Sequence, residues 1–174
     1  MSPELQGSSL MLTAANFKFS VPDGAVYGYF SSAGLRTLEL RDRDAAPPLL
    51  LHSAPNRAWG HALHGLLEHY FAGASVSFGD ISLDLASGTP FQQIVWREAA
   101  KIPYGASATY GELARRIGNP RAARAVGAAL GKNPVCIVVP CHRVLAVNGR
   151  IGGFSAGLHW KRRLLSLERI PCIE

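Results

Sequence analysis

The feature that most constrains the fold is a series of short helical segments between residues 89 and 131, each bounded by turn residues. Thr89 and Gln92 flank Pro90 in a capping box. The Thr89 hydroxyl and the Gln92 side chain can satisfy the first backbone amides of a helix through about residue 101. Turn residues at 102–105 and 118–120 interrupt the pattern. This half of the chain therefore predicts short helices packed together.

Two further helices are expected in this region. Residues 110–117 form one, and Asn119 can cap the next after a tight turn. On the latter helix one face is apolar and the other carries arginine and small residues. The apolar face holds Ala122, Ala123, Val126, Ala129 and Leu130, and the opposite face holds Arg121, Arg124, Gly127, Ala128 and Gly131. A helix-turn-helix unit with a cationic face results, although an ordinary solvated helix face would look the same.

The first half of the chain has a different pattern. Residues 12–41 alternate apolar and polar positions between turn signals, which predicts short antiparallel strands, and residues 42–56 resemble a loop. From Trp59 to Phe71 the apolar spacing is that of an amphipathic helix, and residues 72–88 are rich in turn formers. We expect an α+β protein with a strand-rich domain at 1–85 and a helical domain at 86–174.

Charge and composition narrow the function classes. The 174 residues are 48% hydrophobic and carry a net charge of +6, which is enough for a core and favours an anionic partner. Most of the excess charge lies beyond residue 114. Neither a secretion signal nor about 18 consecutive apolar residues occurs, so we expect a cytoplasmic protein without membrane contact. The three cysteines lack CxxC spacing, so we predict no disulfide framework, no metal and no cofactor.

Cys141 is the candidate nucleophile. It follows an apolar run, 135–139, that we interpret as a buried strand, and it lies between a proline and the pair His142 and Arg143, which can stabilise a thiolate. His142 can accept the proton, and a carboxylate such as Glu168 can fix its tautomer. The alternatives are a packed cysteine and a polar residue at the end of a strand.

Six motifs occur in order at short spacings, namely G-T-P-F-Q-Q-I-V-W, I-P-Y-G, T-Y-G-E-L-A, N-P-R-A-A-R-A-V-G, G-K-N-P and V-P-C-H-R-V-L. Together they resemble the O6-alkylguanine-DNA alkyltransferase family. The resemblance covers about residues 88–170 closely and the first half only in layout. It implies a ribonuclease H-like N-terminal domain, a winged-helix-like C-terminal domain, and irreversible transfer of an alkyl group from O6 of guanine to the protein.

The resemblance also implies residue roles. Cys141 accepts the alkyl group, His142 acts as base through a water molecule, Glu168 orients His142, and Asn133 braces the turn near the thiol. Tyr110 helps to rotate and bind the target nucleotide. The residues implied in DNA binding are Tyr110, Arg121, Arg124, Ala125, Gly127 and Ala128, of which Arg124 fills the stack left by the flipped base.

The implied substrate pocket is formed by Leu130, Val144, Phe154, Ser155 and Ala156. Two of these depart from the family pattern, which often reads G-Y-S-G-G where this chain has G-F-S-A-G. Phe154 keeps the ring but has no hydroxyl to donate a proton near the base, and Ala156 adds a methyl group. We therefore expect bulky adducts to fit less well.

Three other functions remain as alternatives at this point. A helix-turn-helix regulator would need an effector or dimerisation module, and none is evident. A cysteine hydrolase would turn over, whereas an S-alkyl cysteine is a stable thioether. A lesion-binding protein without repair activity would lack the acceptor cysteine, which this chain retains as Cys141. The expected partner is double-stranded DNA containing O6-alkylguanine, bound by a monomer, with cooperativity on DNA and transfer from O4 of thymine left open.

Overall fold

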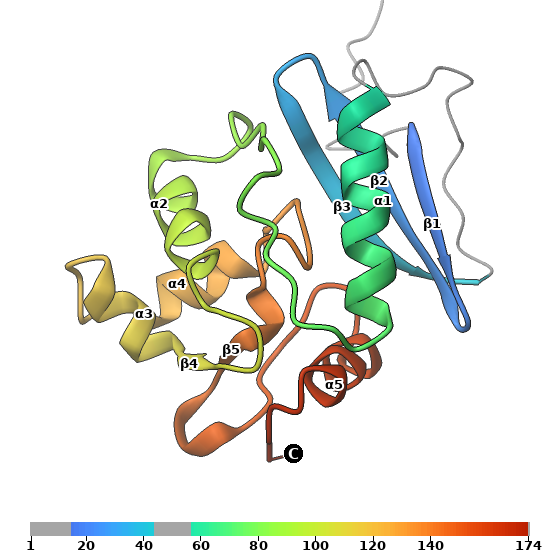
Figure 1. Cartoon of the computed structure of the whole chain (residues 1–174). Coiled ribbons are helices and arrows are strands. Elements are labelled where there is room, and N and C mark those ends of the chain that lie inside the picture. Colours follow the sequence, from blue (N-terminus) through green and yellow to red (C-terminus); the bar gives the residue numbers. More distant parts are fainter. Residues whose placement is uncertain (1–14, 44–56, 174) are drawn as a thin grey trace, which may run out of the picture.

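The computed structural model describes residues 15–43 and 57–173 and combines an antiparallel sheet with packed helices (Figure 1). The sheet and the helix that covers it come from the first half of the chain. The second half contributes a group of short helices and a short parallel strand pair. The mixed helix and sheet composition predicted from the sequence is confirmed.

The sheet contains three strands in the order β1 (Phe17–Val21), β2 (Gly24–Ser31) and β3 (Gly34–Asp42). Both pairings are antiparallel, with one bulge in β2. The tight turns between the strands lie at the predicted turn signals. The strand prediction is therefore confirmed from residue 17 onward. The predicted loop lies almost wholly in 44–56, outside the described residues.

Helix α1 (Arg57–Phe71) lies along one face of this sheet (Figure 1). Leu63, Leu67 and Tyr70 are fully buried, and their spacing of four and three residues is the predicted amphipathic stripe. The prediction of this helix is confirmed, although it begins two residues earlier than expected.

The edge of β3 that does not pair with β2 is bonded to the second half of the chain. The Leu38 amide donates to the Pro134 carbonyl at 2.8 Å, and the Cys136 amide donates to the Leu38 carbonyl at 2.9 Å. Further along the same edge, a Cβ on Gly34 would lie 2.5 Å from the Ser82 carbonyl oxygen, so only glycine permits this close approach. The main hydrophobic core accordingly includes residues from both halves. This edge holds in place the segment that leads to Cys141.

Helix α2 (Pro90–Ala99) begins as the sequence predicts. The Gln92 amide donates to the Thr89 hydroxyl at 3.3 Å, and the Thr89 amide donates to the Gln92 side chain at 2.8 Å. Helix α3 (Tyr110–Arg116) has a second capping box, between Thr109 and Glu112, which the sequence analysis did not identify. Local hydrogen bonding therefore defines the start of both helices.

The predicted cap of the following helix is wrong. Helix α4 (Ala123–Leu130) has Ala122 at its N-cap, with no hydrogen bond from a capping side chain. The Asn119 carbonyl instead accepts from the Ala122 amide at 3.0 Å within the preceding turn. Because that turn occupies residues 119–122, the Asn119 side chain lies too early to reach the first amides of α4.

The predicted strand at 135–139 is also wrong. Ile137 has a φ of +71°, and the Val139 amide donates back to the Val135 carbonyl at 2.9 Å, so the segment curls into a turn. All five of its residues are buried. The run is apolar because the segment is buried on every side. A buried strand and a buried turn both require such a run, so the pattern does not distinguish them. The turn leads into a single 3₁₀ turn, Cys141–Arg143, followed by β5 (Val144–Leu145).

Strand β5 pairs in parallel with β4 (Ala108–Thr109), just before α3. After a loop, helix α5 (Leu158–Leu167) packs beside the 3₁₀ turn and ends immediately before Glu168. The end of α5 therefore delivers the Glu168 carboxylate next to the residues that follow Cys141.

Candidate active site

The thiol of Cys141 lines a cavity of about 370 Å³. The wall is built by α3, by the end of α4 and by the loop before α5. Its other lining residues are Tyr110, Gly127, Leu130, Gly131, Gly153, Phe154 and Ser155. Only 5% of the surface of Cys141 is exposed, so a group that reaches the sulfur must enter this cavity.

The surroundings of Cys141 favour its thiolate. A hydrogen bond from the Cys136 thiol is the main cause that lowers the pKa of Cys141, and burial opposes it. The Asn133 amide, 3.1 Å from the sulfur, and the positive charge of Lys161 lower this pKa further. The same hydrogen bond raises the pKa of Cys136, so of the two buried cysteines Cys141 is the one that ionises.

Asn133 holds both the thiol and the turn before it. Its Nδ2 donates to the Val139 carbonyl at 2.8 Å and to Cys141 Sγ at 3.1 Å, while its Oδ1 accepts from the Val135 amide at 3.0 Å. The side chain is buried, so these contacts are protected from water. The structure thus brings Asn133 to the position implied by the sequence resemblance.

His142 and Glu168 are in direct contact and fully buried. His142 Nε2 lies 2.7 Å from Glu168 Oε1. Burial disfavours ionisation of Glu168, but hydrogen bonds from His142 and Arg143 outweigh it and hold the pKa of Glu168 at about 2. Burial lowers the pKa of His142, so the ring is neutral near pH 7. The ionised Glu168 then requires a proton on Nε2 and leaves Nδ1 as an acceptor.

Nδ1 of His142 is buried and has no hydrogen-bond partner among the described residues. A buried ring nitrogen without a partner is uncommon, and such groups often mark a chemical role. This nitrogen belongs to the residue that follows Cys141, so a proton acceptor lies close to the thiol along the chain. The pair could move a proton away from sulfur.

Arg143 has a different place from the one suggested by the sequence. It does not act on the thiol: its Nε donates to Glu168 Oε2 at 2.7 Å and its Nη2 donates to Oε1 at 2.9 Å. The cation whose charge acts on Cys141 is Lys161. Its Nζ is buried and donates to the Val144 and Gly153 carbonyls at 2.8 and 3.2 Å. Sequence analysis missed Lys161, because a lysine within a basic helix resembles a solvent-exposed residue.

The predicted pocket residues are only partly brought together. Leu130, Phe154 and Ser155 line the cavity with Cys141, whereas Val144 and Ala156 are not among its lining residues. Val144 lies behind the site with its carbonyl on Lys161, and Ala156 faces a neighbouring hollow of about 780 Å³ between β3 and the loop before α5.

Tyr110 stands at the cavity wall. Burial raises the pKa of its phenol, so the hydroxyl stays protonated and can donate. The backbone of Gly152 packs closely against this hydroxyl. Its φ is +65°, and a Cβ at this position would lie 3.0 Å from the Tyr110 oxygen. The loop before α5 therefore limits where this hydroxyl can point.

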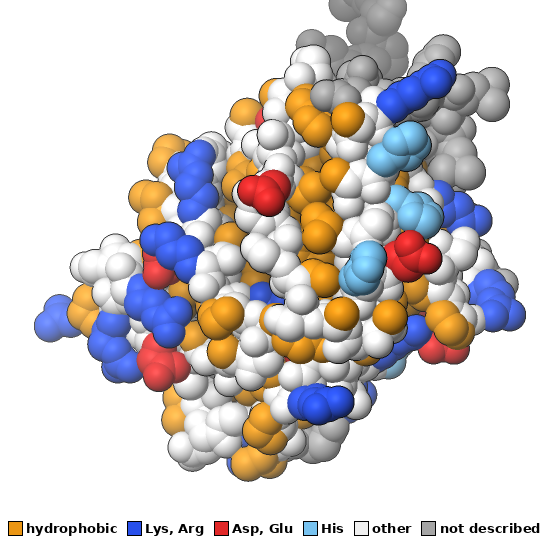
Figure 2. All heavy atoms as spheres, in the orientation of Figure 1, with side chains coloured by type: hydrophobic (Ala, Val, Ile, Leu, Met, Phe, Trp, Pro, Cys, Tyr) orange, Lys and Arg blue, Asp and Glu red, His pale blue; other side chains and the backbone are white. Residues whose placement is uncertain are grey.

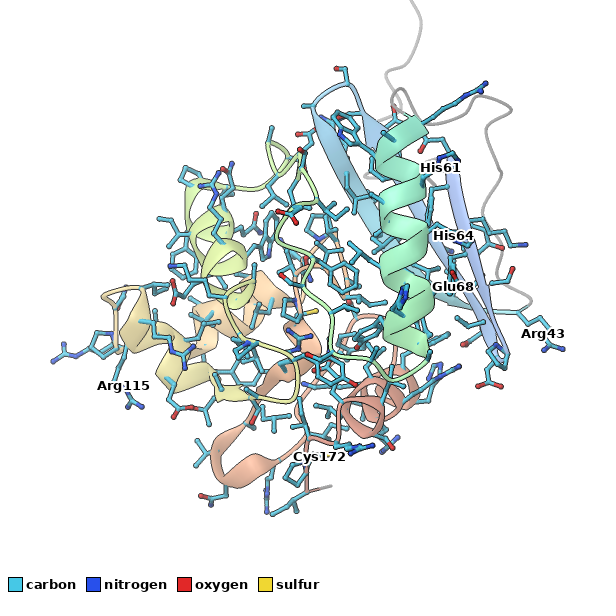
Figure 3. All side chains as sticks on the ribbon, in the orientation of Figure 1. Arg43, His61, His64, Glu68, Arg115 and Cys172 are labelled. Atoms are coloured by element: carbon cyan, nitrogen blue, oxygen red, sulfur yellow. The ribbon has the colours of Figure 1, made fainter. Side chains whose placement is uncertain are left out.

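The predicted cationic face lies beside the cavity. Arg121, Arg124, Ala125 and Ala128 are exposed, while Gly127 is half-buried against the Tyr110 ring. Figure 2 shows Lys and Arg side chains gathered on the side of the molecule where α2 and α3 lie. Arg115 projects outward from α3 (Figure 3). Such a surface suits a phosphate backbone.

In the part of the chain that the structure describes, no helix is long and apolar enough to cross a membrane. Within those same ranges, no group of three or more His, Cys, Asp or Glu side chains could hold a metal ion. The site thus combines a candidate cysteine nucleophile with a neighbouring His–Glu pair, beside a basic helical surface.

Comparisons with known proteins identify the family to which the chain belongs. Residues 90–170 match the family model of the 6-O-methylguanine DNA methyltransferase DNA binding domain. A methylated-DNA--protein-cysteine methyltransferase from Haemophilus influenzae is 42% identical over 160 residues, which span 85% of this chain and 88% of the relative. Another, from Methanosarcina acetivorans, is 53% identical over 102 residues, or 59% of this chain and 64% of the relative.

Among solved structures, the crystal structure of Mycobacterium tuberculosis OGT in complex with DNA is similar, with a TM-score of 0.73 and 39% identity. The match covers 87% of this chain and 91% of that one. The chain belongs to the methylated-DNA--protein-cysteine methyltransferase family.

Proposed function

We propose that this enzyme reverses DNA alkylation directly, by moving the alkyl group from O6 of guanine to Cys141. The observation that carries the proposal is the lowered pKa of a thiol that lines a cavity beside an exposed cationic helix face. Membership of a family whose relatives are named methylated-DNA--protein-cysteine methyltransferases supports the same reaction. Double-stranded DNA is then the partner.

The chemical step needs only this chain and the lesion. The Cys141 proton passes to Nδ1 of neutral His142 through a water molecule, and Glu168 stabilises the resulting imidazolium. The thiolate electron pair forms an S–C bond to the alkyl carbon. The C–O6 bond breaks, its electron pair remains on guanine, and the base takes up a proton. The thioether product has no leaving group, so each molecule reacts once.

The target base must leave the duplex to reach the buried sulfur. Extrusion costs a few kcal/mol, which a pocket for the base and a side chain in the vacated stack can offset. We propose that Arg124, which is exposed on α4, fills the space that the flipped base leaves in the base stack. Tyr110, in the cavity wall, would contact the rotated nucleotide. The exposed Arg121, Ala125 and Ala128, with Gly127, complete the surface that meets DNA.

The proposal extends to the finer architecture. Residues 1–85 form the ribonuclease H-like domain and residues 86–174 form the winged-helix-like domain that carries the thiol. The sheet with α1 and the helical group around α3 and α4 support this division. The protein acts as a monomer in the cytoplasm, needs no cofactor, and accepts small adducts better than bulky ones, which the cavity of about 370 Å³ around Cys141 supports.

Intact mass measurement tests the proposal. With excess O6-methylguanine DNA, the protein should gain one methyl group, roughly 14 Da, and then stop. Peptide mapping should place it on Cys141 and leave Cys136 and Cys172 unmodified, because Cys141 lines the cavity and has a lowered pKa, whereas the pKa of the buried Cys136 is raised. Cys172, near the C-terminus (Figure 3), is partly exposed and serves as an internal control for nonspecific alkylation.

Cys141→Ser is the matched variant. It should bind the same DNA and gain no mass. Catalytic turnover, a methyl group on Cys136, or repair by Cys141→Ser would each overturn the assignment.

A further inference from the structure

Tyr70 reaches the candidate active site from the other half of the chain. It lies near the end of α1, whose exposed face carries His61, His64 and Glu68 (Figure 3), while Tyr70 points inward and is fully buried. Its hydroxyl donates to Glu168 Oε1 at 2.7 Å. None of the motifs in the second half of the chain includes this residue.

Tyr70 and His142 share one carboxylate oxygen. Oε1 of Glu168 lies 2.7 Å from the Tyr70 hydroxyl, 2.7 Å from His142 Nε2 and 2.9 Å from Arg143 Nη2. The Tyr70 hydroxyl is itself 3.4 Å from His142 Nε2. The other oxygen, Oε2, accepts from Arg143 Nε at 2.7 Å and from the Gly105 amide at 3.3 Å. The phenol therefore competes with the imidazole for the negative charge on Oε1.

The Tyr70 ring is held in a fixed position. It packs edge-on against Phe71, Phe78 and Tyr104, with centroid distances of 5.3, 5.9 and 6.1 Å. Burial, followed by the negative charge of Glu168, raises the pKa of the phenol far above its usual range. The hydroxyl is thus a permanent donor, and the hydrogen bond persists through the pH range in which His142 titrates.

We propose that Tyr70 is a positioning residue that lowers the basicity of His142 through Glu168, so that the N-terminal half of the chain tunes the proton acceptor of the active site. This inference rests on the proposed function, because it concerns the residue that takes the Cys141 proton. Donation by Tyr70 withdraws charge from Oε1, so less charge stabilises a protonated imidazole.

The other charged and titratable groups around His142 act in known directions. Glu168, beyond α5, raises the pKa of His142, whereas Arg143 in the 3₁₀ turn and Lys161 on α5 lower it. Cys141, the preceding residue, is the proton donor in the proposed step. Tyr70 is the group on α1 that contacts this pair. Replacing it with phenylalanine leaves these charges in place and strengthens the pull of Glu168 on the His142 proton.

The test is Tyr70→Phe, which removes one oxygen and keeps the ring. The single-turnover rate of methyl transfer is measured against pH with saturating O6-methylguanine DNA. As the pH is lowered, the rate of the variant should begin to fall at a higher pH than that of the wild type, because a more basic His142 becomes protonated earlier. We expect a displacement of up to about one pH unit, because a hydrogen bond to a charged group shifts a pKa by about one unit and the change at Glu168 reaches His142 only in part. The ¹⁵N NMR titration of the His142 ring should move upward by the same amount.

Tyr104→Phe is the control. Its hydroxyl donates to the Gly73 and Leu167 carbonyls at 3.1 and 2.9 Å, one exposed and one partly buried hydrogen bond, so the variant also loses phenol hydrogen bonds close to Tyr70. Since neither of these two hydrogen bonds involves Glu168 or His142, both titrations should match the wild type. Any general loss of stability in Tyr70→Phe can be compared with that in this variant.

A Tyr70→Phe protein whose rate profile and NMR titration both coincide with the wild type would overturn the proposal, as would equal displacement in Tyr104→Phe. A uniform fall in rate at all pH values, with an unmoved His142 titration, would reduce Tyr70 to a packing role. Failure of the proposed function is seen separately, as absence of the methyl group on wild-type Cys141, and the NMR titration needs no alkyl transfer.

Discussion

Replacing Glu168 with glutamine is the sharpest single test of the proton pathway. The amide has nearly the shape of the carboxylate, so the change removes charge and one pair of acceptor sites while keeping the side-chain volume. The carboxylate accepts from Tyr70, His142, Arg143 and the Gly105 amide. In Glu168→Gln the buried Arg143 guanidinium loses its counter-ion, and the His142 ring can be held in the wrong tautomer.

The pKa of Glu168 sets the scale of the stability loss. It falls from 4.5 to about 2 despite burial, which corresponds to about 3 kcal/mol of stabilisation of the folded state at neutral pH. Because the folded-state pKa is the lower one, this contribution is complete above pH 4.5 and disappears as the pH falls toward 2. The variant should therefore be less stable at pH 7, and its stability should depend less on pH in that acid window.

The kinetic effect follows because His142, the proposed base, loses the carboxylate that fixes its tautomer and stabilises its protonated form. General base catalysis typically contributes about 10²- to 10⁴-fold, so the single-turnover rate should fall within that range. Affinity for DNA should change little, because the Glu168 side chain is fully buried, whereas the proposed DNA-contacting residues Arg121 and Arg124 are exposed. Rapid-quench transfer of a labelled methyl group gives the rate, and fluorescence anisotropy with Cys141→Ser as host gives the affinity.

Two outcomes would refute this reasoning. An unchanged single-turnover rate in a folded Glu168→Gln protein would remove the carboxylate from proton transfer. A rate loss matched by an equal loss of DNA affinity would mean that the substitution disturbs the fold rather than the His142 tautomer. Urea unfolding at pH 7 and at pH 3 separates these cases.

The other predictions concern DNA and the thiol. Arg124→Ala should slow repair in duplex DNA far more than reaction with free O6-benzylguanine, because only the duplex has a stack to fill; equal slowing would assign Arg124 to the chemistry. Affinity for undamaged duplex should fall steeply between about 50 and 200 mM salt, as phosphate contacts require, and a flat dependence would contradict an electrostatic interface. Asn133→Ala should raise the pKa of Cys141, seen as slower iodoacetamide labelling at pH 7 with the loss regained at high pH.

Local patterns alone were sufficient for much of this protein. The start of α2 was predictable because the capping box between Thr89 and Gln92 uses residues three apart, and the buried stripe of α1 follows from helical periodicity. Cys141 and its neighbour His142 were recognisable as candidates because the proposed nucleophile and the proposed base are adjacent in sequence. The exposure of Arg124 on α4 was also predictable, since both faces of a helix can be deduced from its own residues.

Tertiary contacts decided the rest of the site. The apolar run 135–139 is a turn because β3 and the core enclose it on all sides, and periodicity cannot tell an enclosed turn from a strand. Arg143 pairs with Glu168 rather than with the thiol, and Lys161 supplies the charge near Cys141, because α5 packs against the 3₁₀ turn. Tyr70 meets Glu168 from 98 residues away along the chain.

The residues proposed to perform the chemistry are thus visible in the sequence, whereas Lys161 and Tyr70, which act on the pKa values of Cys141 and Glu168 or contact them, are not. A motif records neighbours along the chain, within reach of local hydrogen bonds. A pKa responds to burial and to charges a few ångströms away in space, and only the packed fold determines which side chains those are.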